Sequence, residues 1–220
     1  MYRKNCKIVT ADNLPLTFFS ILTIILLTNK IIKDNKMTKT STKSLVYIAI
    51  GTALIATFSQ ISLSIGPIPF TLQTLAIGFI ACLYKPKEAI ASVGLYLTLG
   101  AIGLPIFAGF SGGFAALTGP TAGFLWGFLL YATITSMITK ITSDPINIFL
   151  ACLLGTASCF ALGCLVFKII SGASWSDTIT WTILPFILPD LLKISLVTIC
   201  HRLSRPIIKK EAYFVKPRLK

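Results

Sequence analysis

The sequence predicts an all-α membrane protein with six transmembrane helices and both termini in the cytoplasm. Three observations support this fold class: an unusually apolar composition, six long apolar runs, and an uneven distribution of positive charge. Of the 220 residues, 55% are hydrophobic and only 12% are charged, whereas soluble domains carry about 25% charged residues. A chain of this size could not expose so much apolar surface to water, but it could expose it to lipid.

Six apolar runs are candidates for membrane crossings. They are Leu45–Ile65, Phe70–Tyr84, Ala89–Gly103, Thr121–Thr139, Ile146–Ile170 and Leu184–His201. The third run is shorter than the roughly 20 residues of a full crossing and leads into a glycine-rich segment. We expect this run to be partly re-entrant, which requires its free backbone to be buried in protein or to line a cavity.

The positions of Lys and Arg set the expected orientation. All but two of the 20 basic residues precede the first run, follow the last, or fall in connections that a six-helix weave places on the same side. The exceptions are Lys168, at the opposite side, and Lys193, inside the sixth run. The positive-inside rule then places both termini in the cytoplasm, as in a multi-pass membrane protein. The net charge of +13 is therefore a topology signal, and no nucleic-acid partner is expected.

The chain divides into three regions: an N-terminal extension (1–36), a six-helix membrane domain (37–203) and a basic cytoplasmic tail (204–220). In the extension, Leu14–Leu27 is apolar like a signal-peptide core, but no small-residue cleavage site follows it. We expect Met37 to be the initiator, and the alternative is that the extension forms an extra apolar helix. Mass spectrometry of the native N-terminus separates these, because a peptide covering Thr17–Lys30 would exclude initiation at Met37.

Asp190 and Lys193 are the most costly residues in the sixth run. Each charge costs about 2.5–3.5 kcal/mol at the bilayer centre on insertion scales, and their i, i+3 spacing lets them pair on one helix face. The pair indicates a polar ligand site, and a purely structural ion pair is the alternative. We expect Pro185 and Pro189 to interrupt the helix there and to open its backbone to a cavity.

The glycine-rich segment 100–113 faces outward in this topology and mixes Gly, Pro and Phe with one hydroxyl and no charge. A solvated loop would be polar, so we expect this segment to fold back as a lid that offers Phe107, Phe110 and backbone N–H groups to a ligand. The alternative is a structural cap. Gln73, Thr71 and Thr121 add groups that donate and accept hydrogen bonds at outer ends of the runs.

Small residues spaced four apart indicate close helix packing in lipid. The glycines of the fourth and fifth runs are expected to pack against each other within the chain. Ala49 and Ala53 in the first run could instead face another protein. The six cysteines lack metal-site spacing and His201 is the one histidine, so neither a metal nor a cofactor is expected. No GxxxxGK[ST] motif is present. A membrane enzyme would need a nucleophile with a base, or a metal cluster, within the runs, and Asp190 is the one acid well inside them.

Four stretches resemble the BioY family, the substrate-binding (S) subunits of energy-coupling-factor (ECF) biotin transporters. They are GPIPFTLQTL (66–75), YLTLGAIGLPIFAGFSGG (96–113), GPTAGF (119–124) and PFILPDLLK (185–193). The resemblance covers about Leu45 to His201. It implies an S-component-like bundle of six helices that captures biotin near the outer surface and is not an enzyme. An S subunit for another small vitamin is the closest alternative.

The resemblance also implies the site. Asp190 and Lys193 fall on the family's acidic and basic binding positions. The full expected set of substrate-binding residues is Asp190, Lys193, Gln73, Thr71, Phe107, Ser111, Gly112, Gly113, Thr121 and Trp126. Ala49 and Ala53 match the pattern by which such subunits dock on a transmembrane coupling protein, which would work with ATPase subunits. Facilitated uptake by this subunit alone is the alternative.

Two positions depart from the family pattern. Ser111 stands where some relatives carry Asn, and Leu125 stands where at least one carries Arg. The group that binds the biotin carboxylate is therefore open: Lys193 and backbone N–H groups are the candidates.

Overall fold

The computed structural model describes residues 39–63, 68–141 and 144–208, which belong to one compact unit, Met37–Lys220. The predictions for residues 1–36, including initiation at Met37, lie outside the described residues, as does most of the basic tail. The division of the chain into three regions therefore stays a prediction.

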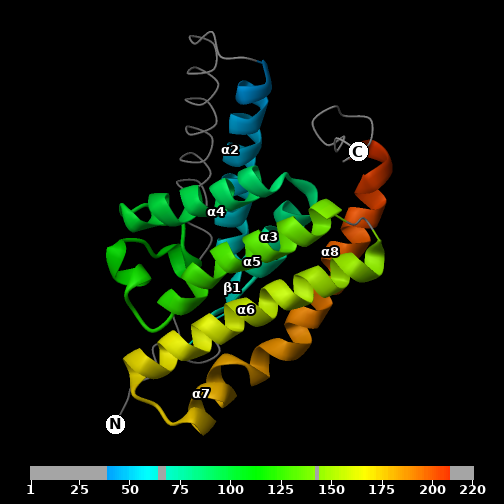
Figure 1. Ribbon diagram of the computed structural model, residues 1–220. Helices are drawn as coiled ribbons and strands as arrows, with labels where there is room; N and C mark the ends of the chain where they lie inside the picture. The colour runs from blue at the N-terminus through cyan, green and yellow to red at the C-terminus, as the bar shows by residue number, and fades with distance from the viewer. Residues whose placement is uncertain (1–38, 64–67, 142–143, 209–220) are drawn as a thin grey trace. The chain divides into compact units, whose positions relative to one another are not determined.

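The described chain is almost entirely helical, which confirms the all-α class (Figure 1). The longer helices are α2 (Lys39–Gln60), α3 (Gln73–Leu83), α4 (Pro86–Ala101), α5 (Ala122–Ile141), α6 (Pro145–Ser171) and α8 (Leu184–Ile208). The short elements are strands β1 (Ser62–Leu63) and β2 (Phe70–Thr71), 3-10 turns η2 (Ala108–Phe110) and η3 (Phe114–Leu117), and helix α7 (Trp175–Thr182). The two strands pair antiparallel, with Ser62 opposite Thr71.

Each predicted apolar run overlaps one of the longer helices, but not all of these helices are long enough to cross a membrane. In the described part of the chain, four segments are long and apolar enough to cross a membrane: Thr42–Gln60, Ala122–Ile141, Pro145–Ser171 and Trp175–Ser204. Helices α3 and α4 have 11 and 16 residues, fewer than the roughly 20 of a straight crossing. The count of six crossings and the cytoplasmic termini stay predictions.

Local sequence explains where the helices begin and end. Pro86 and Pro145 lie in the first turns of α4 and α6, where a missing N–H costs no intrahelical bond. Helix α6 ends at Gly172, whose φ of 66° belongs to the left-handed region that glycine adopts without steric cost. Ser174 caps α7 by accepting a hydrogen bond from the Asp177 N–H at 3.1 Å.

The predicted interruption of the sixth run by proline is wrong. Helix α8 begins at Leu184 and continues through both Pro185 and Pro189. Pro185 lies in the first turn, where its missing N–H has no consequence. Pro189 removes the hydrogen bond that its N–H would have donated to the carbonyl of Pro185, yet the helix carries Asp190 and Lys193 onward without a break.

Glycines bring α5 and α6 into close contact, as predicted. A Cβ added to Gly123 would lie 2.9 Å from the Gly163 Cα, and one added to Gly127 would lie 3.0 Å from the Cys159 Cα. Side chains at these positions would force the two backbones apart. The small-residue stripes of the fourth and fifth runs therefore serve packing within the chain.

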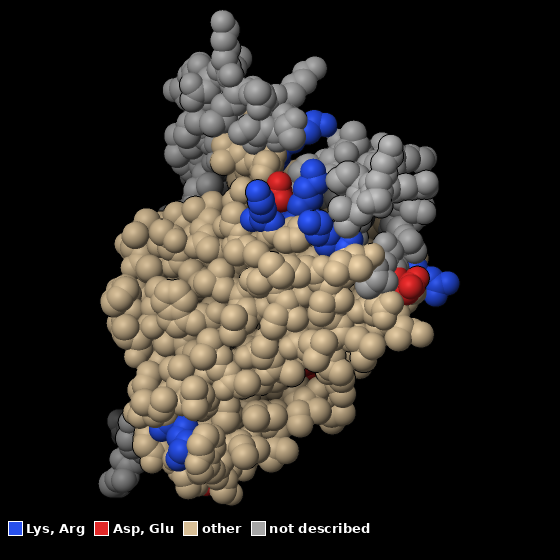
Figure 2. Space-filling view, viewed as in Figure 1, with Lys and Arg blue, Asp and Glu red and all other residues tan. Residues whose placement is uncertain are grey.

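Charged side chains are unevenly distributed over the described surface. Figure 2 shows Lys and Arg gathered at the end where α2 begins and α8 ends, with a separate blue area near α7. Lys168 is the one Lys or Arg in residues 144–184. Between them, the visible face is almost free of charge. A surface that faces lipid requires an uncharged zone of this kind between its charged ends.

Candidate functional site

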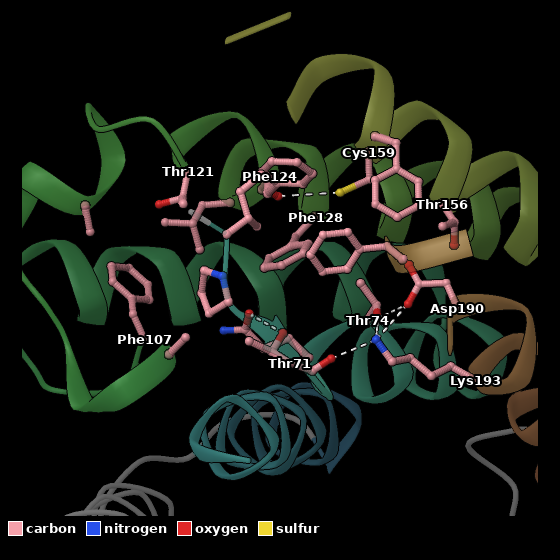
Figure 3. Close-up of a pocket in the computed structure, with 18 of the residues that line it drawn as sticks. Thr71, Thr74, Phe107, Thr121, Phe124, Phe128, Thr156, Cys159, Asp190 and Lys193 are labelled. Carbon is pink, nitrogen blue, oxygen red and sulfur yellow. Dashed lines mark hydrogen bonds and ion pairs between the residues drawn. The ribbon is translucent and has the colours of Figure 1, made fainter. Parts of the chain in front are cut away.

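A cavity of about 140 Å³ lies among residues of α3, α5, α6, α8 and the segment after α4 (Figure 3). Aromatic rings form much of its wall: Phe107, Phe124, Phe128, Phe160 and Phe186. Polar side chains gather at one end, where Thr71, Thr74, Asp190 and Lys193 meet. A mostly apolar cavity with a few convergent polar groups is typical of a small-molecule site.

The Lys193 ammonium group is fully engaged at the polar end of the cavity. Its Nζ lies 2.7 Å from the Asp190 Oδ1, 2.8 Å from the Thr71 carbonyl oxygen and 3.1 Å from the Thr74 Oγ1. The same nitrogen lies 4.1 Å from the centre of the Phe70 ring. An ammonium group has three N–H donors, so each has an acceptor within the protein.

Asp190 keeps one oxygen available. Its Oδ1 accepts hydrogen bonds from Lys193 and, at 3.4 Å, from the Thr74 hydroxyl. Among the described residues, Oδ2 has no hydrogen-bond partner, and it is not among the buried polar atoms left unsatisfied. Asp190 lines the cavity, so Oδ2 is a candidate acceptor for a ligand.

The contacts of the buried ion pair offset its desolvation cost, but they do not explain why two charges are placed there. Asp190 and Lys193 are only 5% and 6% exposed, and desolvating both charges costs several kcal/mol each. Close pairing and the additional hydrogen bonds offset this cost. Two apolar side chains would be as stable or more so, which favours a role in binding over a purely structural one.

Gln73 connects the cavity to the segment after α4. Its Oε1 accepts from the Thr71 hydroxyl at 3.0 Å, and its Nε2 donates to the Tyr96 hydroxyl. Tyr96 in turn donates to the Ile106 carbonyl at 3.2 Å. Since an amide has two N–H groups, Gln73 can give its second to a ligand.

The structure brings together most of the residues that the sequence predicted. Seven of them line the cavity: Thr71, Gln73, Phe107, Ser111, Thr121, Asp190 and Lys193. Leu125, at the position of the expected departure from the family, lines it too. Figure 3 shows Phe107 and Thr121 at the opposite end from Asp190 and Lys193.

Three predicted residues are not among those that line this cavity. Trp126 is 45% exposed, and its Nε1 donates to the Leu117 carbonyl at 3.2 Å. Gly112 is exposed, and the Gly113 N–H donates to the Gly100 carbonyl at 2.7 Å. Both glycines shape the segment after α4, and a part in binding stays a prediction for all three.

Sequence reasoning missed several lining residues: Thr74, Phe124, Phe128, Thr156, Cys159, Phe160 and Phe186. Thr74, Phe124 and Phe186 lie inside stretches that carried the family resemblance, which was a usable signal. Thr156 and Cys159 gave none, because they lie on α6 among the small residues that pack against α5. The Phe160 ring lies between the other two rings: its centre is 6.2 Å from that of Phe124 and 6.1 Å from that of Phe186.

The predicted docking residues lie away from the cavity lining. Ala49 and Ala53 are one turn apart on α2, and both are partly exposed. Their surface is therefore accessible in part to another protein.

Helices of membrane-spanning length around a cavity with an aromatic wall and an ionic end define a membrane-embedded binding protein for a small molecule. The BioY family model matches residues 33–210. The chain belongs to the BioY family, which confirms the resemblance seen in its motifs.

Two biotin transporters are similar in sequence to this chain over most of its length. The biotin transporter BioY2 of Lactococcus lactis subsp. cremoris (strain MG1363) is 38% identical over 164 residues, which cover 74% of this chain and 90% of that protein. The probable biotin transporter BioY of Pyrococcus horikoshii is 34% identical over 163 residues, covering 74% of this chain and 96% of the relative.

A solved structure shares the fold. The crystal structure of the S-component for biotin from an ECF-type ABC transporter aligns with a TM-score of 0.73 and 27% identity, covering 81% of this chain and 97% of that one. The family and the fold are those of a transporter component and not of an enzyme.

Proposed function

We propose that this protein captures biotin and serves as the substrate-binding subunit of an ECF-type transporter, as a multi-pass protein of the bacterial inner membrane. The supporting observation is the buried Asp190–Lys193 pair at the end of an aromatic cavity, in a chain 38% identical over 164 residues to a biotin transporter.

The ureido ring of biotin matches the polar end of the cavity. This ring carries two N–H donors and one carbonyl acceptor. The Asp190 Oδ2 is free to accept one N–H, and Gln73, which also lines the cavity, has an N–H left for the ureido oxygen. The 2.7 Å ion pair with Lys193 orients Asp190, and a charged acceptor makes a stronger hydrogen bond than a neutral one.

The remainder of biotin is mostly apolar. Its sulfur-containing ring and valeryl chain suit the space between Phe107, Phe124 and Phe128. Apolar contact on several sides would contribute about 25 cal/mol for each Å² removed from water. The aromatic wall therefore supplies affinity, and the polar end supplies orientation.

The biotin carboxylate belongs at the end of the cavity away from Lys193. Lys193 spends its three donors on protein acceptors, and Leu125 offers no charge. At the opposite end, where Figure 3 shows Phe107 and Thr121, Thr121 is partly exposed. Ser111, which pairs with Phe107, is exposed, so a carboxylate there keeps part of its hydration. Hydroxyls and nearby backbone N–H groups are its expected partners.

Uptake would be driven by partner subunits. The sequence contains no phosphate-binding GxxxxGK[ST] loop, so ATP hydrolysis is assigned to separate ATPase subunits. A transmembrane coupling protein would dock on α2 at Ala49 and Ala53, where small side chains allow close approach. Facilitated uptake without these partners is the alternative that a transport assay would reveal.

Calorimetric titration of the detergent-solubilised protein tests the proposal. Biotin should bind with one-to-one stoichiometry and without conversion, and a panel of other small vitamins should not bind. Replacing the ureido oxygen, as in 2-iminobiotin, should weaken binding more than replacing the carboxylate, as in biotinamide. Tight binding of a different vitamin and not of biotin would overturn the assignment.

A further inference from the structure

Gln60 makes two hydrogen bonds to a turn that supplies part of the cavity lining. It is the last residue of α2 and is not among the lining residues. Its Nε2 donates to the Phe107 carbonyl at 3.3 Å, and its Oε1 accepts from the Phe110 N–H at 3.0 Å. One side-chain amide thus pairs with both a carbonyl and an N–H of the same backbone turn.

The turn itself, Ile106–Ser111, is called the lid turn here. Its ends are joined by the Phe107 N–H, which donates to the Ser111 carbonyl at 2.9 Å. Inside it, Gly109 and Phe110 have φ values of 67° and 57°. A left-handed conformation is easy for glycine but unfavourable for phenylalanine. The Phe110 backbone therefore needs outside support, and its N–H receives it from Gln60.

The lid turn supplies part of the cavity wall. Phe107, Ala108 and Ser111 all line the cavity. The Phe107 ring is only 2% exposed and contacts the Tyr96 ring, with centres 5.3 Å apart. The position of this wall consequently depends on the backbone of the turn, and so on the groups that hold that backbone.

We infer that Gln60 is a positioning residue for substrate capture: it holds the lid turn closed over the cavity and so slows release of the ligand. This inference rests on the proposed function, because it takes the cavity as the biotin site. Gln60, which lies outside the cavity lining, would then affect how long the ligand stays bound. The apparent affinity scales with the fraction of protein in the closed, binding-competent state, and Gln60 raises that fraction.

Hydrogen–deuterium exchange of the ligand-free protein tests the hold on the turn without biotin. Gln60→Ala should speed exchange in a peptide covering residues 106–113, with exchange in α5 and α6 unchanged. Gln60→Glu keeps an acceptor for the Phe110 N–H and should retain more protection there. The control is Thr57→Ala, one turn earlier on α2. Among the described residues, the exposed Thr57 hydroxyl bonds only to the Ala53 carbonyl of its own helix, at 2.8 Å.

Release of labelled biotin tests the consequence for capture. Loss of two hydrogen bonds of ordinary strength in Gln60→Ala should speed release by about 5- to 150-fold, while Thr57→Ala should release biotin at the native rate. Phe110→Gly removes the steric cost of the left-handed backbone, so Gln60→Ala should have a smaller effect in that background than in the native protein.

The outcomes separate this inference from the proposed function. Unchanged exchange in the lid turn, faster exchange throughout α5 and α6, or an unchanged release rate would each overturn the role of Gln60. Equal effects of Gln60→Ala in the native and Phe110→Gly backgrounds would do so as well. If the native protein fails to bind biotin at all, the proposed function fails, and the exchange experiment still reports on the contact itself.

Discussion

Lys193 Nζ lies 2.7 Å from Asp190 Oδ1, one helical turn away on α8, and both side chains are buried at the end of the cavity. The same ammonium group donates to the carbonyl of Thr71 at the end of β2. The pair therefore holds α8 against the strand as well as forming the polar end of the site. Binding and stability must be separated experimentally, because removing either charge affects both.

Asp190→Asn should weaken biotin binding by at least about 100-fold and also lower the thermal midpoint of the protein. The substitution removes the charged acceptor and leaves the Lys193 ammonium buried without a counter-charge, which costs about 3–5 kcal/mol in comparable pairs. Calorimetry measures the first effect, and thermal unfolding in detergent measures the second. Native affinity in a folded variant would remove Asp190 from the site.

The double variant Asp190→Leu/Lys193→Met separates the two roles. Replacing both charges with apolar side chains of similar volume is often neutral or stabilising, so the thermal midpoint should recover relative to Asp190→Asn. Biotin binding should stay lost, because the acceptor for the ureido N–H is still absent. A double variant that binds biotin normally would show that the pair only joins α8 to the rest of the bundle.

Thr74→Val should reduce biotin affinity by about 3- to 10-fold, the effect of one hydrogen bond of ordinary strength. The hydroxyl accepts from Lys193 at 3.1 Å and donates to Asp190 at 3.4 Å, so its loss loosens the pair while the side-chain shape is kept. Thr98→Val is the matched control, since Thr98 is exposed and bonds to the Gly94 carbonyl of its own helix. Equal effects of the two substitutions would contradict a specific role for Thr74.

Ala49→Trp and Ala53→Trp should leave biotin binding intact but block uptake in cells that contain the coupling partners. A large side chain on this part of α2 prevents the close helix approach that small residues permit. Leu154→Trp is the control, because Leu154 is 56% exposed on α6 and should tolerate the change in both assays. Uptake that survives in the Ala variants would mean that these alanines do not dock or that no partner is needed.

Gly127→Ala should destabilise the protein by about 1–3 kcal/mol, as overpacking does in a filled interior. The added Cβ would lie 2.8 Å from the Cys159 Sγ and 3.0 Å from its Cα, so α5 and α6 must move apart. Gly94→Ala is the counterpart, because its Cβ meets nothing within 4 Å and alanine favours the helix by about 1 kcal/mol. The thermal midpoint should fall in the first variant and hold or rise in the second.

The site was predicted best where chemistry alone identified the residue. Asp190, Lys193 and Gln73 stood out because polar groups are costly in apolar runs, and all three line the cavity. Trp126 was chosen for its aromatic ring, but it lies outside the lining, whereas its neighbour Leu125 lies inside. Adjacent helical residues point about 100° apart, and residue type could not show which of the two faces the cavity.

Thr156 and Cys159 are residues of the cavity lining that the sequence did not identify. Both line the cavity from α6, between glycines that pack on α5. A stripe of small residues indicates a close helix contact but does not show where that contact opens into a space. Similarly, the proline pattern favoured a broken helix, whereas α8 is continuous through Pro189.

The sequence by itself determined the membrane character, the α-helical class, the approximate helix positions and the residues of highest energetic cost, because these depend on composition and on local spacing. Only the tertiary structure decided which donors of Lys193 are occupied, which oxygen of Asp190 is free, and that Gln60 supports the lid turn. These contacts join residues as far as 122 positions apart, as between Thr71 and Lys193. Their geometry is fixed by how whole helices pack, which no local pattern records.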